Sequence, residues 1–179
     1  TLLLSGTNPF TGATLVKEGT LLVGSASALL RTRDITLAGT SMVQPVPDGV
    51  VIQSPVTLMD EATTATVGAP ASRPGSGVVS TLTLRGAIGG AGNVVFSSNI
   101  AQNALSTVFL AAQSTYAGGT LLDTTAPKDG ITIGENQIIV RLGTHDALPP
   151  TTVLTIDGGN GSGTGRFAEM NLNGFINSN

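Results

Sequence analysis

The chain has 179 residues, with 24 Gly, 9 Pro, no Cys, 3% aromatic and 11% charged residues, so neither disulfides nor thiolate metal sites can form. An average protein has about 25% charged residues, which means that Thr, Ser, Asn and Gly supply much of the solvated surface here. The net charge of −3 and the scattered Lys and Arg provide no basic face, which excludes nucleic acid as an expected partner.

Short segments rich in β-branched and aliphatic residues recur along the chain, and Gly, Pro, Asp and Asn punctuate them, which predicts strands. In chain order we expect strands at Thr1–Leu4, Thr14–Val16, Thr20–Val23, Asp34–Leu37, Val50–Gln53, Val56–Met59, Val78–Leu84, Asn93–Phe96, Thr107–Leu110, Thr120–Leu122, Gln137–Leu142 and Val153–Ile156. The best helical candidate, Asn99–Ser106, is shorter than the roughly 12 to 15 residues that an isolated helix needs. The expected fold is therefore all-β with little or no helix.

An internal repeat organises these segments. Thr1–Val16 (TLLLSGTNPFTGATLV) aligns with Thr107–Leu122 (TVFLAAQSTYAGGTLL), and Leu21–Gly39 aligns with Val140–Gly158. The second copy carries extra residues around Pro127–Gln137. Repeated apolar strand segments with inserts of variable length are typical of a solenoid, because each coil buries its inner face against the next.

The sequence pattern of the strand segments also does not indicate a solvent-exposed face. Thr or apolar residues fill both phases of the alternation in TLLL, TLTL and QIIVRL, whereas a sheet with one solvated side usually carries charged residues there. Ladders of similar side chains on stacked parallel strands tolerate this pattern. We expect the interior to be filled by Leu4, Leu15, Leu21, Val23, Leu37, Leu84, Phe96, Leu110, Leu121, Leu142 and Ile156.

The segment Leu2–Gly24 (LLLSGTNPFTGATLVKEGTLLVG) resembles the strand repeat of bacterial autotransporter passenger domains, commonly written LTLSGxNTYTGGTxVxxGTLxxG. The second copy contains the aromatic-x-Gly-Gly-Thr core as Tyr116–Thr120, whereas Pro9 and Ala13 depart from the motif in the first copy. The resemblance implies a right-handed parallel β-helix, with residues 1–179 forming one segment of a longer protein or one stacking subunit. It also implies a place at the bacterial cell surface or outside the cell.

Both ends of the chain lie inside repeats, and no polar cap is visible. Uncapped solenoid ends expose backbone hydrogen-bonding groups and apolar interior. We therefore expect end-to-end self-association or continuation into further repeats. No apolar run approaches the roughly 20 residues needed to span a bilayer, so we expect no membrane insertion by this segment.

Candidate catalytic and ligand-binding groups are few, and we expect no catalytic residue, metal site or cofactor. His145, the single histidine, lies in a turn and has no second His to share a metal or a catalytic role. The run Gly158–Gly163 approaches a calcium-binding nonapeptide but has Gly163 where Asp is required. The acids group only as Asp60–Glu61 and as Asp123 with Asp129.

We interpret the chain as a non-catalytic structural β-solenoid, serving as a stalk, coat or self-stacking fibre. An alternative is an adhesin that binds glycans, matrix or like molecules through the loops Thr40–Gly49, Asp60–Gly77 and Thr124–Glu135. A polysaccharide-degrading β-helix enzyme is disfavoured, because such enzymes need two or more acids on one coil face.

Overall fold

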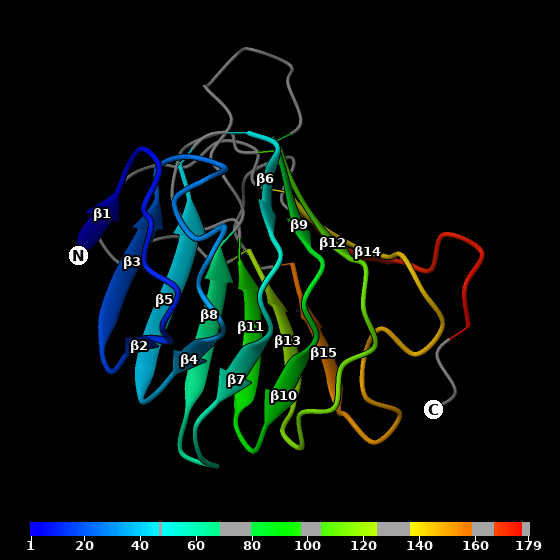
Figure 1. Ribbon diagram of the computed structural model, residues 1–179. Helices are drawn as coiled ribbons and strands as arrows, with labels where there is room; N and C mark the ends of the chain where they lie inside the picture. Colours follow the sequence, from blue (N-terminus) through cyan, green and yellow to red (C-terminus); the bar gives the residue numbers. More distant parts are fainter. Residues whose placement is uncertain (47, 69–79, 98–104, 125–136, 159–166, 177–179) are drawn as a thin grey trace, which may run out of the picture.

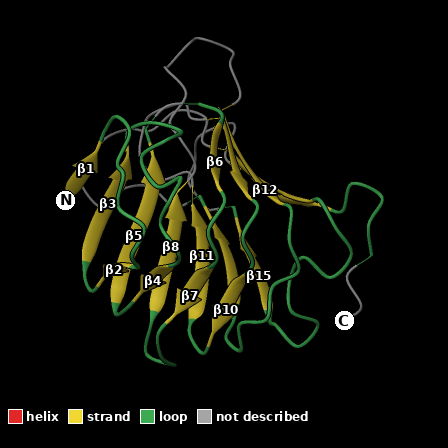
Figure 2. Cartoon of the chain, in the orientation of Figure 1, coloured by secondary structure: helices red, strands yellow, loops and turns green. Residues whose placement is uncertain are grey.

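The computed structural model describes residues 1–46, 48–68, 80–97, 105–124, 137–158 and 167–176. These residues form strands and turns without a helix, as Figure 2 shows. Consequently no helix in the described ranges is available to cross a membrane. All strand pairings found between the described strands are parallel, and they build three sheets, here called sheets A, B and C.

Sheet A has seven strands, which lie side by side from the N-terminal end of the molecule in Figure 1. In spatial order they are β1 (Leu2–Leu4), β3 (Gly19–Val23), β5 (Thr40–Pro45), β8 (Thr64–Gly68), β11 (Asn93–Ser97), β13 (Thr120–Asp123) and β15 (Leu154–Asp157). At about 4.8 Å between neighbouring strands, sheet A extends roughly 30 Å along the stacking direction.

Sheets B and C are shorter and complete the enclosure. Sheet B has the order β10 (Ile88–Gly90), β7 (Val56–Leu58), β4 (Ile35–Leu37) and β2 (Thr14–Val16). Sheet C has the order β16 (Phe167–Asn171), β14 (Gln137–Leu142), β12 (Leu105–Leu110), β9 (Ser80–Leu84) and β6 (Val50–Ile52). From β5 to β11 the chain makes two circuits, each of which passes through sheets A, C and B and then returns to A. This parallel coiling is compatible with a β-solenoid.

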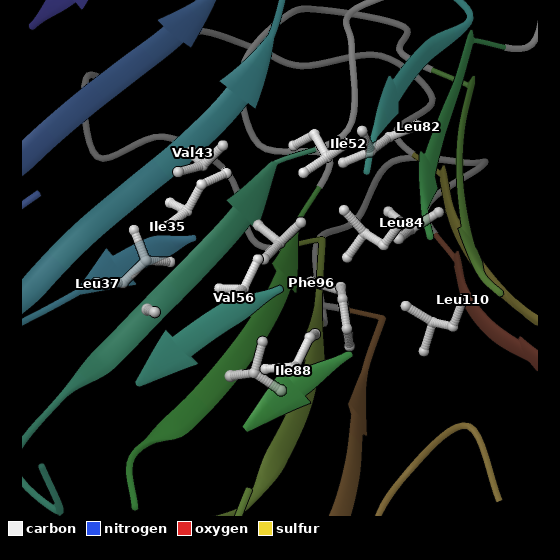
Figure 3. Packing of buried hydrophobic residues seen from close by; sticks show 14 of the residues in the cluster. Ile35, Leu37, Val43, Ile52, Val56, Leu82, Leu84, Ile88, Phe96 and Leu110 are labelled. Carbon is white, nitrogen blue, oxygen red and sulfur yellow. The ribbon is translucent and has the colours of Figure 1, made fainter. Parts of the chain in front are cut away.

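The core lies between the three sheets and consists mainly of Val, Ile and Leu. Figure 3 shows side chains from all three sheets pointing toward one another, including Leu37 of β4, Phe96 of β11 and Leu84 of β9. All three side chains are at most 1% exposed. Because each coil contributes residues to the core from different sheets, the packing connects segments that are far apart in sequence.

Alternation along the strands decides which expected core residues are inside. In β13, Thr120 and Leu122 point inward while Leu121 is only half-buried on the outside, and Leu15 of β2 is 47% exposed. Leu15 and Leu121 were therefore wrongly expected in the interior, because neighbouring threonines take the inward phase. Ile156 belongs to an inward row but lies on the edge strand β15, and it is 48% exposed.

Corresponding strands of the two repeat copies lie in different sheets. Strands β1, β2, β3 and β4 of the first copy lie in sheets A, B, A and B, whereas β12, β13, β14 and β15 of the second copy lie in sheets C, A, C and A. Successive turns of the chain in sheet A differ in length: Leu2 pairs with Leu21, 19 residues later, and Leu122 pairs with Ile156, 34 residues later. The repeat therefore preserves the strand-turn-strand unit while its position around the coil changes.

Candidate functional site

Each of the two repeat copies contains a threonine pair that joins successive coils. Thr14 Oγ1 lies 2.9 Å from Thr32 Oγ1, which donates a hydrogen bond to the Gly12 carbonyl at 2.8 Å. In the second copy, Thr120 Oγ1 lies 2.9 Å from Thr152 Oγ1, which donates to the Gly118 carbonyl at 2.9 Å. Gly12 and Thr14 are equivalent to Gly118 and Thr120 in the repeat, whereas Thr152 lies one residue after Thr151, the equivalent of Thr32. The similar hydrogen bonds give the repeated Gly and first Thr positions a structural role.

Tyr116 extends this network in the second copy. Its side chain is 1% exposed, and its hydroxyl is hydrogen-bonded to Thr120. Burial raises the pKa of Tyr116 to about 12, although hydrogen bonds to Thr120 and Thr152 partly oppose this effect. Tyr116 is therefore neutral near pH 7 and serves as a buried packing group.

The glycine that follows Tyr116 in the motif allows two coils to approach closely. A Cβ atom built on Gly118 would collide with the backbone of Gly92 in the preceding coil. The Ala117 amide donates a hydrogen bond to the Gly90 carbonyl at 2.9 Å beside this contact. The aromatic-x-Gly-Gly-Thr core thus describes how one coil packs on the coil before it.

His145 helps to attach the C-terminal segment of the described chain. Its Nδ1 accepts a hydrogen bond from the Ile176 backbone amide at 3.2 Å, and its ring meets Phe175 edge-on with centroids 5.2 Å apart. The His145 carbonyl accepts a hydrogen bond from Gln113 Nε2 at 3.2 Å. These contacts give His145 an observed structural role in the turn that follows β14.

The acidic candidates Asp60 and Asp123 lie apart, because Asp60 follows β7 of sheet B and Asp123 ends β13 of sheet A. Asp60 Oδ1 accepts a hydrogen bond from Thr63 Oγ1 at 2.9 Å and so stabilises the turn after β7. Asp123 is in register with Asp157 of the next coil, while Asp129 and residues 159–163 of the glycine run lie outside the described residues. The described residues contain no group of three or more His, Asp or Glu placed to hold a metal ion.

Two expected binding loops contain strands. Residues 40–45 of the segment Thr40–Gly49 form β5, and residues 64–68 of the segment Asp60–Gly77 form β8. Side chains in β5 and β8 alternate between the core and the outside, as in other strands. Ser41, Val43 and Ala65 point inward and are at most 2% exposed. Residues 69–77 and 125–135, which complete the second and third expected loops, lie outside the described residues.

The two end strands of sheet A carry exposed apolar side chains in the described part of the chain. One inward row of sheet A runs through Leu2, Leu21, Val43, Val67, Phe96, Leu122 and Ile156. The five middle side chains are at most 3% exposed, whereas Leu2 is 59% and Ile156 48% exposed. Each end of the row therefore presents to solvent an apolar position that is covered everywhere else.

The N-terminal end face is also hollowed. A groove of about 310 Å³ lies beside β1, β2 and β3, and apolar side chains that include Leu2, Leu4 and Val16 line it. Lys17 and Glu18 contribute the charged groups of its lining. An apolar groove with a charged rim is suited to a packing contact.

Comparisons of the chain with protein-family models, with curated proteins and with solved structures found no match.

Proposed function

We propose that this chain is a right-handed β-solenoid with a non-catalytic structural role, and that its end faces bind further coils of the same kind. It would act as a stalk, coat or self-stacking fibre of a bacterial surface or extracellular protein. The observation that carries the proposal is the inward row of sheet A, which is buried along its length and exposed at both ends.

A comparison of the two repeat copies supports a partner on the N-terminal face. Phe10 corresponds to Tyr116 and Gly12 to Gly118, yet Phe10 is 38% exposed and a Cβ atom on Gly12 would meet nothing within 4 Å. In the second copy the preceding coil explains the glycine, and the aromatic ring of Tyr116 is buried. The first copy carries the same type of motif on a face that is open in the monomer, as expected for a surface on which another coil packs.

The energetics favour covering these faces. Burying one aliphatic side chain fully contributes about 1.5 to 3 kcal/mol, and Leu2 and Ile156 each retain about half of their exposure. Among the described strands, β1 and β15 also each have one side without a partner strand, whose backbone groups can extend a parallel ladder. A further coil on each end face would bury the exposed apolar side chains and would also form hydrogen bonds with the backbone groups of the edge strands.

The handedness and the cellular location rest on general considerations. Parallel strands in one sheet are connected by right-handed crossovers in about 98% of cases, which supports a right-handed coil. The resemblance of Leu2–Gly24 to autotransporter passenger repeats supports a place at the bacterial surface or in the extracellular space. A stack of coils is suited to a mechanical role when its inward-facing rows of side chains carry no charge and its turns repeat.

Sedimentation velocity across a concentration series, with electron microscopy of the same samples, tests the stacking. The informative variants are Leu2→Glu and Ile156→Glu, each of which places a charge on one end face only. Leu30→Glu is the matched control, because Leu30 is 52% exposed in the turn between β3 and β4. The wild type and the control should form filaments.

The two end variants also determine the polarity of stacking. In head-to-tail stacking each variant alone remains monomeric, and an equimolar mixture forms dimers only, because one functional face of each kind remains. If Ile156→Glu alone forms dimers, two N-terminal faces pair with each other and the head-to-tail arrangement is wrong. A wild-type chain that is monomeric at every concentration overturns the proposal of self-stacking.

A further inference from the structure

The outer face of sheet C carries a row of side chains that differs in chemistry from the rest of the solenoid surface. Register pairing aligns Thr83 of β9, Phe109 of β12, Arg141 of β14 and Asn171 of β16 across four neighbouring strands. Their neighbours Leu82, Val108 and Val140 point into the core and are 0% exposed. Alternation therefore places the row on the side away from the core.

A second row runs parallel to the first, through Thr81, Thr107, Ile139 and Glu169. Residues of both rows line a groove of about 450 Å³. This volume lies within the range of about 300 to 1,000 Å³ that is typical of small-molecule sites. The lining combines an aromatic ring, an aliphatic side chain, hydroxyls, an amide and a guanidinium group, as in sites that hold a ligand with polar and apolar faces.

The aromatic residue in the groove is positioned by its neighbour. Phe109 lies against Gly143 of the next coil, where a Cβ atom would collide with its ring. Phe109 is half-buried, so part of the ring remains accessible in the groove. A partly exposed ring held in place can receive the apolar face of a sugar at little cost in conformational entropy.

The polar groups in the groove retain hydrogen-bonding capacity. Arg141 Nη2 donates to Asn173 Oδ1 at 3.1 Å, and no carboxylate of the described residues lies within 4.0 Å of the Arg141 guanidinium. The remaining guanidinium N–H groups can bind a carboxylate in a bidentate manner. Glu169, the acid on the adjacent strand, accepts a hydrogen bond from Asn171 Nδ2 at 3.3 Å.

We propose that this groove binds a saccharide that carries a carboxylate group. In this arrangement a pyranose ring packs on Phe109, the hydroxyls of Thr81 and Thr83 bond to sugar hydroxyls, and the sugar carboxylate pairs with Arg141. The site lies on the side of the stack and is separate from the end faces. Its occupation therefore depends neither on stacking nor on the structural role proposed above.

The exposed position of Arg141 limits the strength of the interaction. An exposed ion pair is weakened by solvent and by salt, and the chain's net charge of −3 opposes an anion. We therefore expect weak affinity for a single saccharide, with a dissociation constant of about 0.1 to 1 mM. Affinity should fall as the salt concentration rises.

Titration of the folded chain with trigalacturonate, followed by calorimetry and by NMR, tests the site. The neutral methyl ester of the same trisaccharide is the ligand control, since it keeps the rings and hydroxyls but removes the charge. Arg141→Gln is the test variant. Arg31→Gln is its matched control, because Arg31 is exposed in the turn between β3 and β4 and its loss changes the net charge equally.

Trigalacturonate should bind the wild type and Arg31→Gln with affinities within about twofold of each other, whereas Arg141→Gln should lose about tenfold or more. The methyl ester should bind about tenfold more weakly to the wild type and equally weakly to Arg141→Gln. Phe109→Leu should weaken both ligands. Circular dichroism and melting curves must show that each variant is folded.

Several results would overturn the proposal. One is the absence of binding by the folded wild type at about 10 mM trigalacturonate. Another is an equal loss of affinity in Arg141→Gln and Arg31→Gln, which would assign the effect to overall charge. Equal affinity of the wild type for trigalacturonate and for its methyl ester would show that Arg141 does not bind a carboxylate of the ligand.

Discussion

Truncation of two leucines on neighbouring strands of sheet B tests the assignment of inside and outside. Leu37 of β4 is 0% exposed and is in register with Val16 and Leu58 on its two sides, whereas Leu15 of β2 is 47% exposed. Coils on both sides hinder the collapse of a cavity at position 37. Within the range of 2 to 5 kcal/mol for buried Leu→Ala, we expect Leu37→Ala to lower the free energy of unfolding by about 3 kcal/mol.

Leu15→Ala should cost only about 0.5 kcal/mol, as is usual for a surface substitution. For a chain of this length, the loss expected for Leu37→Ala corresponds to a fall in melting temperature of roughly 6 to 12 °C. Leu37→Asp should prevent folding altogether, because the site offers an ionised carboxylate no compensating partner.

Urea unfolding at low protein concentration measures the difference. Far-UV circular dichroism reports the sheets, and the near-UV signal of Tyr116, the single tyrosine in a chain without Trp, reports the second repeat copy. Coincidence of the two transitions permits a single free energy of unfolding to be assigned. Equal midpoints for the two alanine variants, or a parent-like melting curve for Leu37→Asp, would show that the inward phase of sheet B is misassigned.

Two further predictions concern the contact between coils in the second repeat copy. In the folded chain the absorbance titration of Tyr116 should have its midpoint near pH 12, whereas in urea it should lie near pH 10. As the pH rises, the Tyr116 hydroxyl loses its proton in the unfolded state before it does so in the folded state. The contribution of neutral Tyr116 to the free energy of unfolding is therefore complete below pH 10. Between pH 10 and 12 it should fall by about 2 to 3 kcal/mol, and this loss should be absent in Tyr116→Phe. Gly118→Ala should destabilise the fold by about 2 kcal/mol or more, because the added methyl group collides with Gly92. Gly12→Ala should leave the urea midpoint of the monomer unchanged. Similar midpoints for the two alanine variants would contradict this account of the glycines.

Much of the strand content could be predicted because most strands carry a strong local signal. All twelve expected segments overlap observed strands, since β-branched residues flanked by turn residues mark them clearly. The prediction from the sequence did not include β5, β8, β10 and β16, in which Thr, Ser, Gly or Glu interrupt the apolar pattern. Pairing with neighbouring coils stabilises these segments, and a local pattern does not reveal such pairing.

The groove on sheet C illustrates the same limit for a candidate site. Thr83, Phe109, Arg141 and Asn171 are separated by 26 to 32 residues along the chain and become neighbours only through strand register. Unequal coil lengths prevent a constant sequence period from locating such a row. The turn assigned to His145 was recognisable locally, but its contacts with Phe175 and Ile176 were not.

Local chemistry in the sequence was sufficient to indicate an all-β, repetitive chain, because propensity, turn residues and the recurrence of a motif operate over a few neighbouring residues. The tertiary structure decided which phase of each strand is buried, so that Leu15 and Leu121 face outward while Thr120 points inward. It also placed corresponding strands of the two repeat copies in different sheets. These features depend on parallel register between neighbouring coils whose residues are distant in sequence, and register is set by the combined packing of all three sheets around one core.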